Sequence, residues 1–107
     1  MAYDIHVAKT LTIAKRQSPD FQFMEDIHKQ IFSETYLWVK QAKLFSRLKD
    51  YYSDAHFSLA ELPELRSELD RIIEEVNNLR VRELLVQFRE VCRRAQVQQA
   101  DIFCFCD

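Results

Sequence analysis

Glu25 and His28 stand three residues apart, a spacing that places a carboxylate and an imidazole on one face of a helix. Helical bundles that hold two metal ions use a pair of such Glu-x-x-His elements, one on each of two helices. The sequence contains a single copy among its 17 acidic residues and three histidines. Glu25 and His28 are therefore only an alternative metal site, and an ordinary pair at the surface or core edge is the favoured interpretation.

Three thiols are the other possible soft metal ligands: Cys92, Cys104 and Cys106. On a strand Cys104 and Cys106 would share a face, but a structural zinc site usually needs four ligands. An odd number of cysteines without an export signal favours reduced thiols, so we interpret them as small hydrophobic residues. The histidines are scattered and indicate no catalytic triad, so we expect neither an enzyme nor a bound cofactor or metal.

The chain contains no glycine, where an average chain of this length would have roughly seven. Glycine-rich phosphate loops, the dinucleotide fingerprint and the nucleophile elbow all depend on backbone positions that favour glycine. The sequence therefore excludes these three classes of site. It also predicts short connections built on Asn, Asp, Ser and Pro, which favours a function on rigid helical surfaces.

Charge is unevenly distributed, although the net charge is only −2. Residues 54–76 carry seven acids against two arginines, whereas residues 77–100 carry five arginines against two glutamates. The best candidate interaction surface is a set of four glutamates in the first segment: Glu61, Glu64, Glu68 and Glu75. Such an acidic helix face predicts a protein partner with a cationic surface.

A second, weaker candidate is basic: Arg82, Arg89 and Arg93 share one helical face. Arginines in this arrangement can follow a phosphate backbone. However, no aromatic residues are interleaved with them to stack on bases, and the overall balance is acidic. A solvated helix face is the favoured interpretation, and we do not expect a nucleic-acid partner.

A single domain is predicted over residues 1–107, in which 48% of residues are hydrophobic and 30% are charged. Alternating polarity in residues 3–7 predicts a strand, and Leu11 and Ile13 continue its phase. A helix extending to about residue 16 is the alternative. The closing segment 101–107 predicts a buried strand that pairs with the first one, so that the chain ends form a two-stranded sheet.

Helices are predicted between these strands. Ser18-Pro19-Asp20 is typical of a helix start, and the predicted helix reaches Tyr52, with a kink or break near residues 33–35. Its apolar stripe consists of Met24, Ile27, Ile31, Trp38, Ala42, Phe45, Leu48 and Tyr52.

A further helix is predicted from about Pro63, after a capping box formed by Ser58 and Glu61. Its stripe is Leu62, Leu65, Leu69, Ile72 and Val76. The phase then changes at Asn77-Asn78, which indicates a corner that can use left-handed backbone. The next stripe is Val81, Leu85, Phe88, Cys92 and Ala95. The predicted fold is α+β and predominantly helical, with three to four helices and a small terminal sheet; the alternative is an all-α four-helix bundle.

The opening MAYDIHV of residues 1–7 and the closing DIFCFCD of residues 101–107, with Cys92 and Ala95, resemble the ends of small stand-alone bacterial immunity-like or uncharacterised proteins. The chain departs from the resemblance because it lacks a glycine and a tryptophan in the opening and closing loops. The resemblance implies that the protein inhibits a toxin by binding it, and it brings no catalytic residues.

We find neither a membrane-spanning stretch nor a secretory signal, and so expect a cytoplasmic protein without a membrane partner. The leading hypothesis is a non-enzymatic protein-binding module that acts through its acidic helix face. One alternative is a small metal-dependent or carboxylate-using helical enzyme. Another is an obligate homodimer in which the terminal strands pair between subunits.

Overall fold

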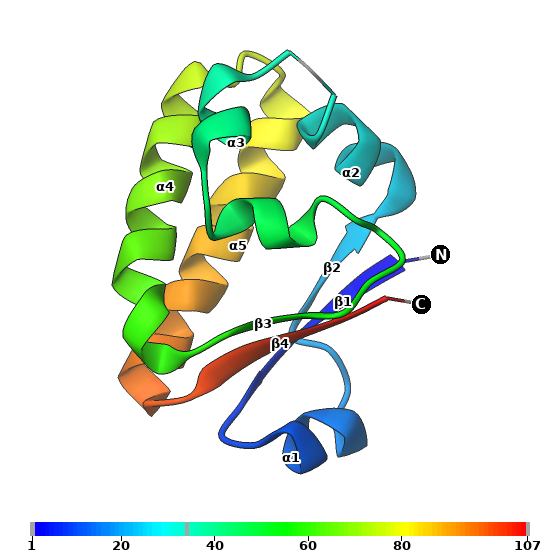
Figure 1. Cartoon of the computed structure of the whole chain (residues 1–107), viewed down its shortest axis with the longest axis vertical. Helices are drawn as coiled ribbons and strands as arrows, with labels where there is room; N and C mark the ends of the chain where they lie inside the picture. Colours follow the sequence, from blue (N-terminus) through cyan, green and yellow to red (C-terminus); the bar gives the residue numbers. More distant parts are fainter. Residues whose placement is uncertain (1, 34, 107) are drawn as a thin grey trace.

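The computed structural model describes residues 2–33 and 35–106, and it is organised around one antiparallel sheet (Figure 1). The strands lie in the order β2-β1-β4-β3. Their bounds are β1 (Ala2–Ala8), β2 (Phe21–Met24), β3 (Ala55–Phe57) and β4 (Asp101–Cys106). One short helix lies on one side of the sheet, and the other helices lie on the opposite side (Figure 1).

The short helix is α1 (Leu11–Arg16). The helices on the opposite side are α2 (Glu25–Ile31), α3 (Leu37–Gln41), α4 (Leu62–Glu75) and α5 (Leu79–Gln98), with the 3-10 helices η1 (Phe45–Leu48) and η2 (Leu59–Glu61). No helix in the described ranges is both long and apolar enough to cross a bilayer.

The two ends of the chain pair as predicted. β1 and β4 are antiparallel neighbours from Tyr3↔Cys106 to Ala8↔Asp101. The sheet nevertheless has four strands instead of the predicted two, because β2 pairs with β1 and β3 pairs with β4. The terminal strands thus pair with each other within one chain, at the centre of the sheet. Pairing between subunits was considered because an isolated two-stranded sheet is marginally stable, and that reason does not apply to a four-stranded sheet.

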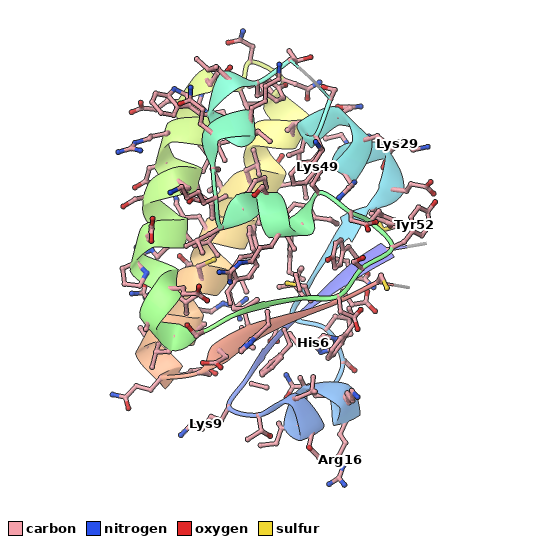
Figure 2. All side chains as sticks on the ribbon, in the orientation of Figure 1. His6, Lys9, Arg16, Lys29, Lys49 and Tyr52 are labelled. Carbon is pink, nitrogen blue, oxygen red and sulfur yellow. The ribbon has the colours of Figure 1, made fainter. Side chains whose placement is uncertain are left out.

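Alternation along β1 and β4 gives the sheet two different faces. Tyr3 and Ile5 are fully buried against the large helices, together with Ile102 and Cys104. The opposite face carries a separate small cluster of Ala8, Ala14 and Phe103, with Phe105 packed against it. His6 also lies between the sheet and α1 (Figure 2). The α+β class is confirmed and the all-α bundle is wrong, but the described residues form five α-helices where three to four were predicted.

The predicted pattern of α4 and α5 is confirmed. Both five-residue apolar stripes are buried: Leu62, Leu65, Leu69, Ile72 and Val76 on the first segment, and Val81, Leu85, Phe88, Cys92 and Ala95 on the second. Ser58 and Glu61 form the capping box, although it opens η2, and Pro63 lies in the first turn of α4 as expected.

The long helix predicted from residue 19 to Tyr52 is wrong. Instead of starting a helix, Asp20 is bonded to β1: its N–H donates to the Ile5 carbonyl at 2.8 Å, and its Oδ2 accepts from the Val7 N–H at 2.7 Å. The chain then enters β2, and the helical parts are the short α2, α3 and η1. α2 ends at Ile31, so the predicted break lies between α2 and α3, with Glu34 outside the described residues.

The continued strand phase at Leu11 and Ile13 is also wrong, because both residues belong to α1. Thr10 ends the extended segment as the N-cap of that helix, where its Oγ1 accepts from the Ile13 N–H at 3.2 Å. The strand and helix hypotheses for this region are therefore each correct for one part of it.

The corner at Asn77-Asn78 exists but is not left-handed. Asn78 has φ of −71° and acts as the N-cap of α5, with its side chain accepting from the Val81 N–H at 3.1 Å. The one positive φ among the described residues is 53° at Gln99, which ends α5. Beyond it the Ala100 N–H donates to the Ala95 carbonyl at 2.9 Å. A glutamine thus occupies a position that glycine usually fills.

We expect Gln99→Gly to raise the free energy of unfolding by about 0.5–1 kcal/mol. A side chain in left-handed backbone is strained, and relieving this strain outweighs the extra entropy that glycine gives to the unfolded state. Gln87→Gly, in the exposed middle of α5, is the matched control and should lower it by about 1 kcal/mol. Urea unfolding measures both. Equal losses in the two variants would contradict the assignment.

Candidate functional site

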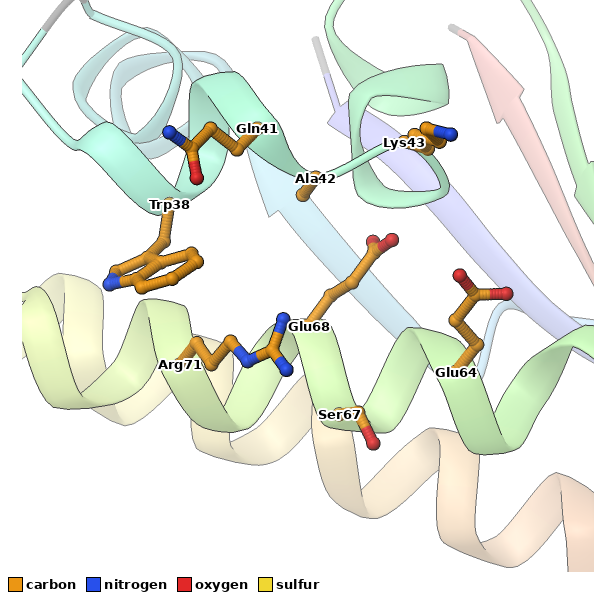
Figure 3. A pocket seen from close by; sticks show the side chains of 8 residues that line it. All are labelled: Trp38, Gln41, Ala42, Lys43, Glu64, Ser67, Glu68 and Arg71. Carbon is orange, nitrogen blue, oxygen red and sulfur yellow. The ribbon is translucent and has the colours of Figure 1, made fainter.

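A groove of about 320 Å³ runs between α3 and α4 (Figure 3). Its lining residues are Trp38, Gln41, Ala42, Lys43, Glu64, Ser67, Glu68 and Arg71. Two of the four predicted interaction residues, Glu64 and Glu68, belong to it. We call this site the α3–α4 groove.

Two carboxylates of α4 bind the backbone of the opposite wall. Glu75 accepts from the N–H groups of Leu37 and Trp38, at 2.7 and 2.8 Å. Glu68 accepts from the N–H groups of Leu44 and Phe45, at 3.1 and 2.8 Å. In Figure 3 the Glu68 side chain rises from α4 toward the link between α3 and η1.

These bonds satisfy N–H groups at the starts of α3 and η1. The N-cap residues there are Tyr36 and Leu44, and neither makes a side-chain capping hydrogen bond. Glu68 and Glu75 are seven residues apart, two helical turns, so both project from one side of α4. Each of these carboxylates takes the place of a missing capping side chain, and its negative charge is favourable at a helix N-terminus.

Trp38 forms the aromatic part of the α3–α4 groove. The Arg71 guanidinium lies 5.3 Å from the centre of its ring, within the range of a cation–π contact. Trp38 is 39% exposed, and its neighbour Leu37 is 56% exposed. The groove thus contains an accessible indole, a side chain that protein interfaces often use, and Leu37 is exposed next to it in the chain but does not line the groove.

The other two glutamates of the predicted surface differ from each other. Glu61 forms a two-point ion pair with Arg47, at 2.9 and 2.6 Å, and belongs to the capping box with Ser58. The hydrogen bonds from Arg47 and Ser58 lower the pKa of Glu61 to about 2. Glu64 is exposed and has no hydrogen bond or ion pair with any described residue. Of the four carboxylates, only Glu64 is left without an internal partner in the described structure.

Glu25 and His28 face different surroundings, although they belong to the same helix. Glu25 pairs with Lys29 at 3.4 Å. His28 is buried, and its Nε2 donates to the Leu48 carbonyl at 2.6 Å, so this nitrogen is not free to bind a metal. Burial lowers the pKa of His28, favouring its neutral form. No cluster of three or more metal-ligating side chains occurs among the described residues.

The predicted basic face is divided by local ion pairs. Arg89 pairs with Asp70 at 2.8 Å, and Arg93 pairs with Glu90 at 2.6 Å. Arg82 is exposed and makes no such pair with the described residues.

The thiols have the environment of core residues. Cys92 and Cys104 are buried, and burial raises the pKa of Cys92 to about 12 and that of Cys104 well above its usual range. Cys106 is half-buried, and its pKa is raised by a hydrogen bond to Asp54. Thiols held in the protonated form are poor nucleophiles and poor metal ligands.

Comparison of the chain with protein-family models, with curated proteins and with solved structures finds no match. The site is therefore interpreted from its own geometry.

Sequence reasoning missed Trp38 and Arg71. Trp38 fitted the apolar stripe of the predicted long helix, and three members of that stripe are exposed: Met24, Trp38 and Tyr52. The useful signal was the break predicted near residues 33–35: α2 ends at Ile31, and Trp38 therefore does not continue the stripe before it. The contact with Arg71 depends on how α3 packs on α4, and no local pattern shows that.

We expect Glu68→Ala to lower the free energy of unfolding by about 1–3 kcal/mol, because it leaves two half-buried N–H groups without acceptors. Glu75→Ala should cost about 0.5–1.5 kcal/mol, since its N–H partners are more exposed. Glu64→Ala is the matched control on the same helix and should change stability by less than about 0.5 kcal/mol. Urea unfolding measures all three, and similar values for the three variants would contradict this assignment.

The Arg47–Glu61 pair predicts a pH dependence. The pKa of Glu61 is lowered from 4.5 to about 2 in the folded state, so its stabilisation is present above pH 4.5 and is lost as the pH falls toward 2. Both side chains are partly exposed, which limits the effect to about 1 kcal/mol. The stability difference between the wild type and Glu61→Gln should therefore narrow over that pH range. A constant difference would contradict the pairing; Glu83→Gln is the control.

Proposed function

We propose that this protein is a non-enzymatic protein-binding module whose contact surface is the α3–α4 groove. The observation that carries the proposal is the exposed indole of Trp38 at a groove whose rim also holds the unpartnered carboxylate of Glu64. Tryptophan is among the residues most often found at the energetic centre of protein interfaces. A surface carboxylate at the other end of the same groove favours a partner that presents a cation (Figure 3).

Rigidity supports the same proposal. The backbone N–H of Trp38 is bound by Glu75, and the Arg71 guanidinium lies over its ring. An anchor that is already ordered loses less conformational entropy when a partner binds, which leaves more of the contact energy for affinity. We infer that the partner inserts an apolar group beside Trp38 and places a lysine or arginine near Glu64.

This proposal revises the acidic surface predicted from the sequence. Glu61, Glu68 and Glu75 contribute negative potential, but their oxygens already accept hydrogen bonds within the chain. Glu64 is left as the direct contact. Together with the resemblance of the chain ends, this arrangement favours an immunity-type role in which a cationic toxin is neutralised in the cytoplasm by binding.

The proposal predicts that Trp38→Ala weakens partner binding by about thirtyfold or more, the loss expected for a central anchor. Glu64→Lys should weaken it by about tenfold, because it places a like charge opposite the cation. The partner is captured from the native host with the wild-type chain and purified, and its dissociation constant is then measured by calorimetry for each variant.

Two matched control variants test whether the loss of affinity is specific to the α3–α4 groove. Leu79 is a large apolar residue, 79% exposed, outside the groove, and Glu83 is an exposed acid on α5. Leu79→Ala and Glu83→Lys should leave the dissociation constant within about twofold of wild type. A captured partner that binds Trp38→Ala as tightly as wild type would refute the proposal.

A further inference from the structure

The face of the sheet that α1 covers has a second hollow, distant in the fold from the α3–α4 groove. Its volume is about 300 Å³. Leu11 and Lys15 of α1 form one wall, His56 of β3 forms another, and Phe103 and Phe105 of β4 contribute aromatic surface. Phe103 and Phe105 are two residues apart on a strand and therefore point to the same face.

One ring in this hollow is already stacked. The His56 imidazole lies parallel to the Phe103 ring, with 4.5 Å between ring centroids and 4° between the planes. Its Nε2 is 2.8 Å from Asp101 Oδ2, and Asp101 Oδ1 accepts the Leu59 N–H at 2.9 Å. These contacts fix the imidazole as a planar, half-exposed wall.

Phe105 is half-buried, and the ring of His6 packs against it at 5.0 Å. His6 is 5% exposed, yet its Nδ1 has no hydrogen-bond partner among the described residues. Figure 2 places His6 between the sheet and α1. A buried polar atom without a protein partner is uncommon, but His6 packs against Phe105 without itself lining the hollow.

The lining of the hollow holds one lysine and one carboxylate. Asp54 is the one acid in the lining, and its Oδ1 already accepts the Cys106 N–H at 2.9 Å. Lys15 forms no ion pair or hydrogen bond in the described part of the chain. A ligand that completes this site therefore needs an anionic group for Lys15 and a flat apolar body for the aromatic surface.

We propose that this hollow binds a small planar aromatic anion, such as an aromatic carboxylate, with its ring against Phe105 beside His56 and its anionic group at Lys15. The volume lies at the lower end of the range for small-molecule sites, roughly 300–1,000 Å³, which limits the ligand to one or two fused rings. This site is separate from the proposed protein-binding groove, and ligand binding in the hollow does not depend on that proposal.

The test is a titration of the full chain with indole-3-carboxylate, monitored by the NMR chemical shifts of the backbone amides. The salt concentration is about 0.15 M, at which charges more than ~8 Å apart are largely screened. The expected result is saturable shifts in α1, β3 and β4, with a dissociation constant of about 1 mM or tighter. Neutral indole and non-aromatic cyclohexanecarboxylate should bind at least about fivefold more weakly, because each lacks one of the two contacts.

Lys15→Glu and Arg16→Glu give a matched pair of charge reversals on α1. Arg16 does not line the hollow, and Figure 2 shows it extending away from the sheet. Lys15→Glu should weaken binding by at least about fivefold and Arg16→Glu by less than about twofold. The absence of saturable shifts, equal losses in the two variants, or equal binding of indole would overturn the proposal. Trp38→Ala should bind indole-3-carboxylate as the wild type does, which separates this site from the protein-binding groove.

Discussion

The carboxylates of Glu68 and Glu75 hold the connection from α3 to η1 onto α4, and the candidate site depends on this attachment. Helix starts leave N–H groups without partners, and the caps at Tyr36 and Leu44 lack capping side-chain hydrogen bonds. The carboxylates supply the four missing acceptors from a different helix. The connection can therefore bury Leu44 and Phe45 without leaving these donors unsatisfied.

Because of this attachment, the four glutamates of the predicted acidic surface do not have the same role. Glu68 and Glu75 bind backbone, Glu61 binds Arg47, and Glu64 has no partner among the described residues. The same attachment determines where Trp38 lies, because its N–H is one of the four donors. The acidic character of α4 is therefore explained by the fold, and the binding role that we propose depends on where this attachment places the tryptophan.

The regular parts of the chain were predictable from sequence, because their signals are local. The apolar stripes of α4 and α5, the capping box at Ser58 and the pairing of the chain ends all follow from periodicity and short-range chemistry. The segment from Pro19 to Tyr52 was not, because Asp20 bonds to β1 and the starts of α3 and η1 are capped from α4. Half of the residues that line the candidate site lie in this segment and half on α4. Glu64 and Glu68 were identified from the charge of α4, whereas the contact between Trp38 and Arg71 depends on how the two segments pack and was missed.

Amide hydrogen exchange of Leu37, Trp38, Leu44 and Phe45 tests the attachment most directly. In the wild type all four amides should exchange slowly, as donors in hydrogen bonds that open only by local unfolding. In Glu75→Ala the first two should lose protection, and in Glu68→Ala the last two, while the amides of the α5 core stay protected. Fast exchange of all four amides in the wild type, or exchange unchanged by either substitution, would contradict the account.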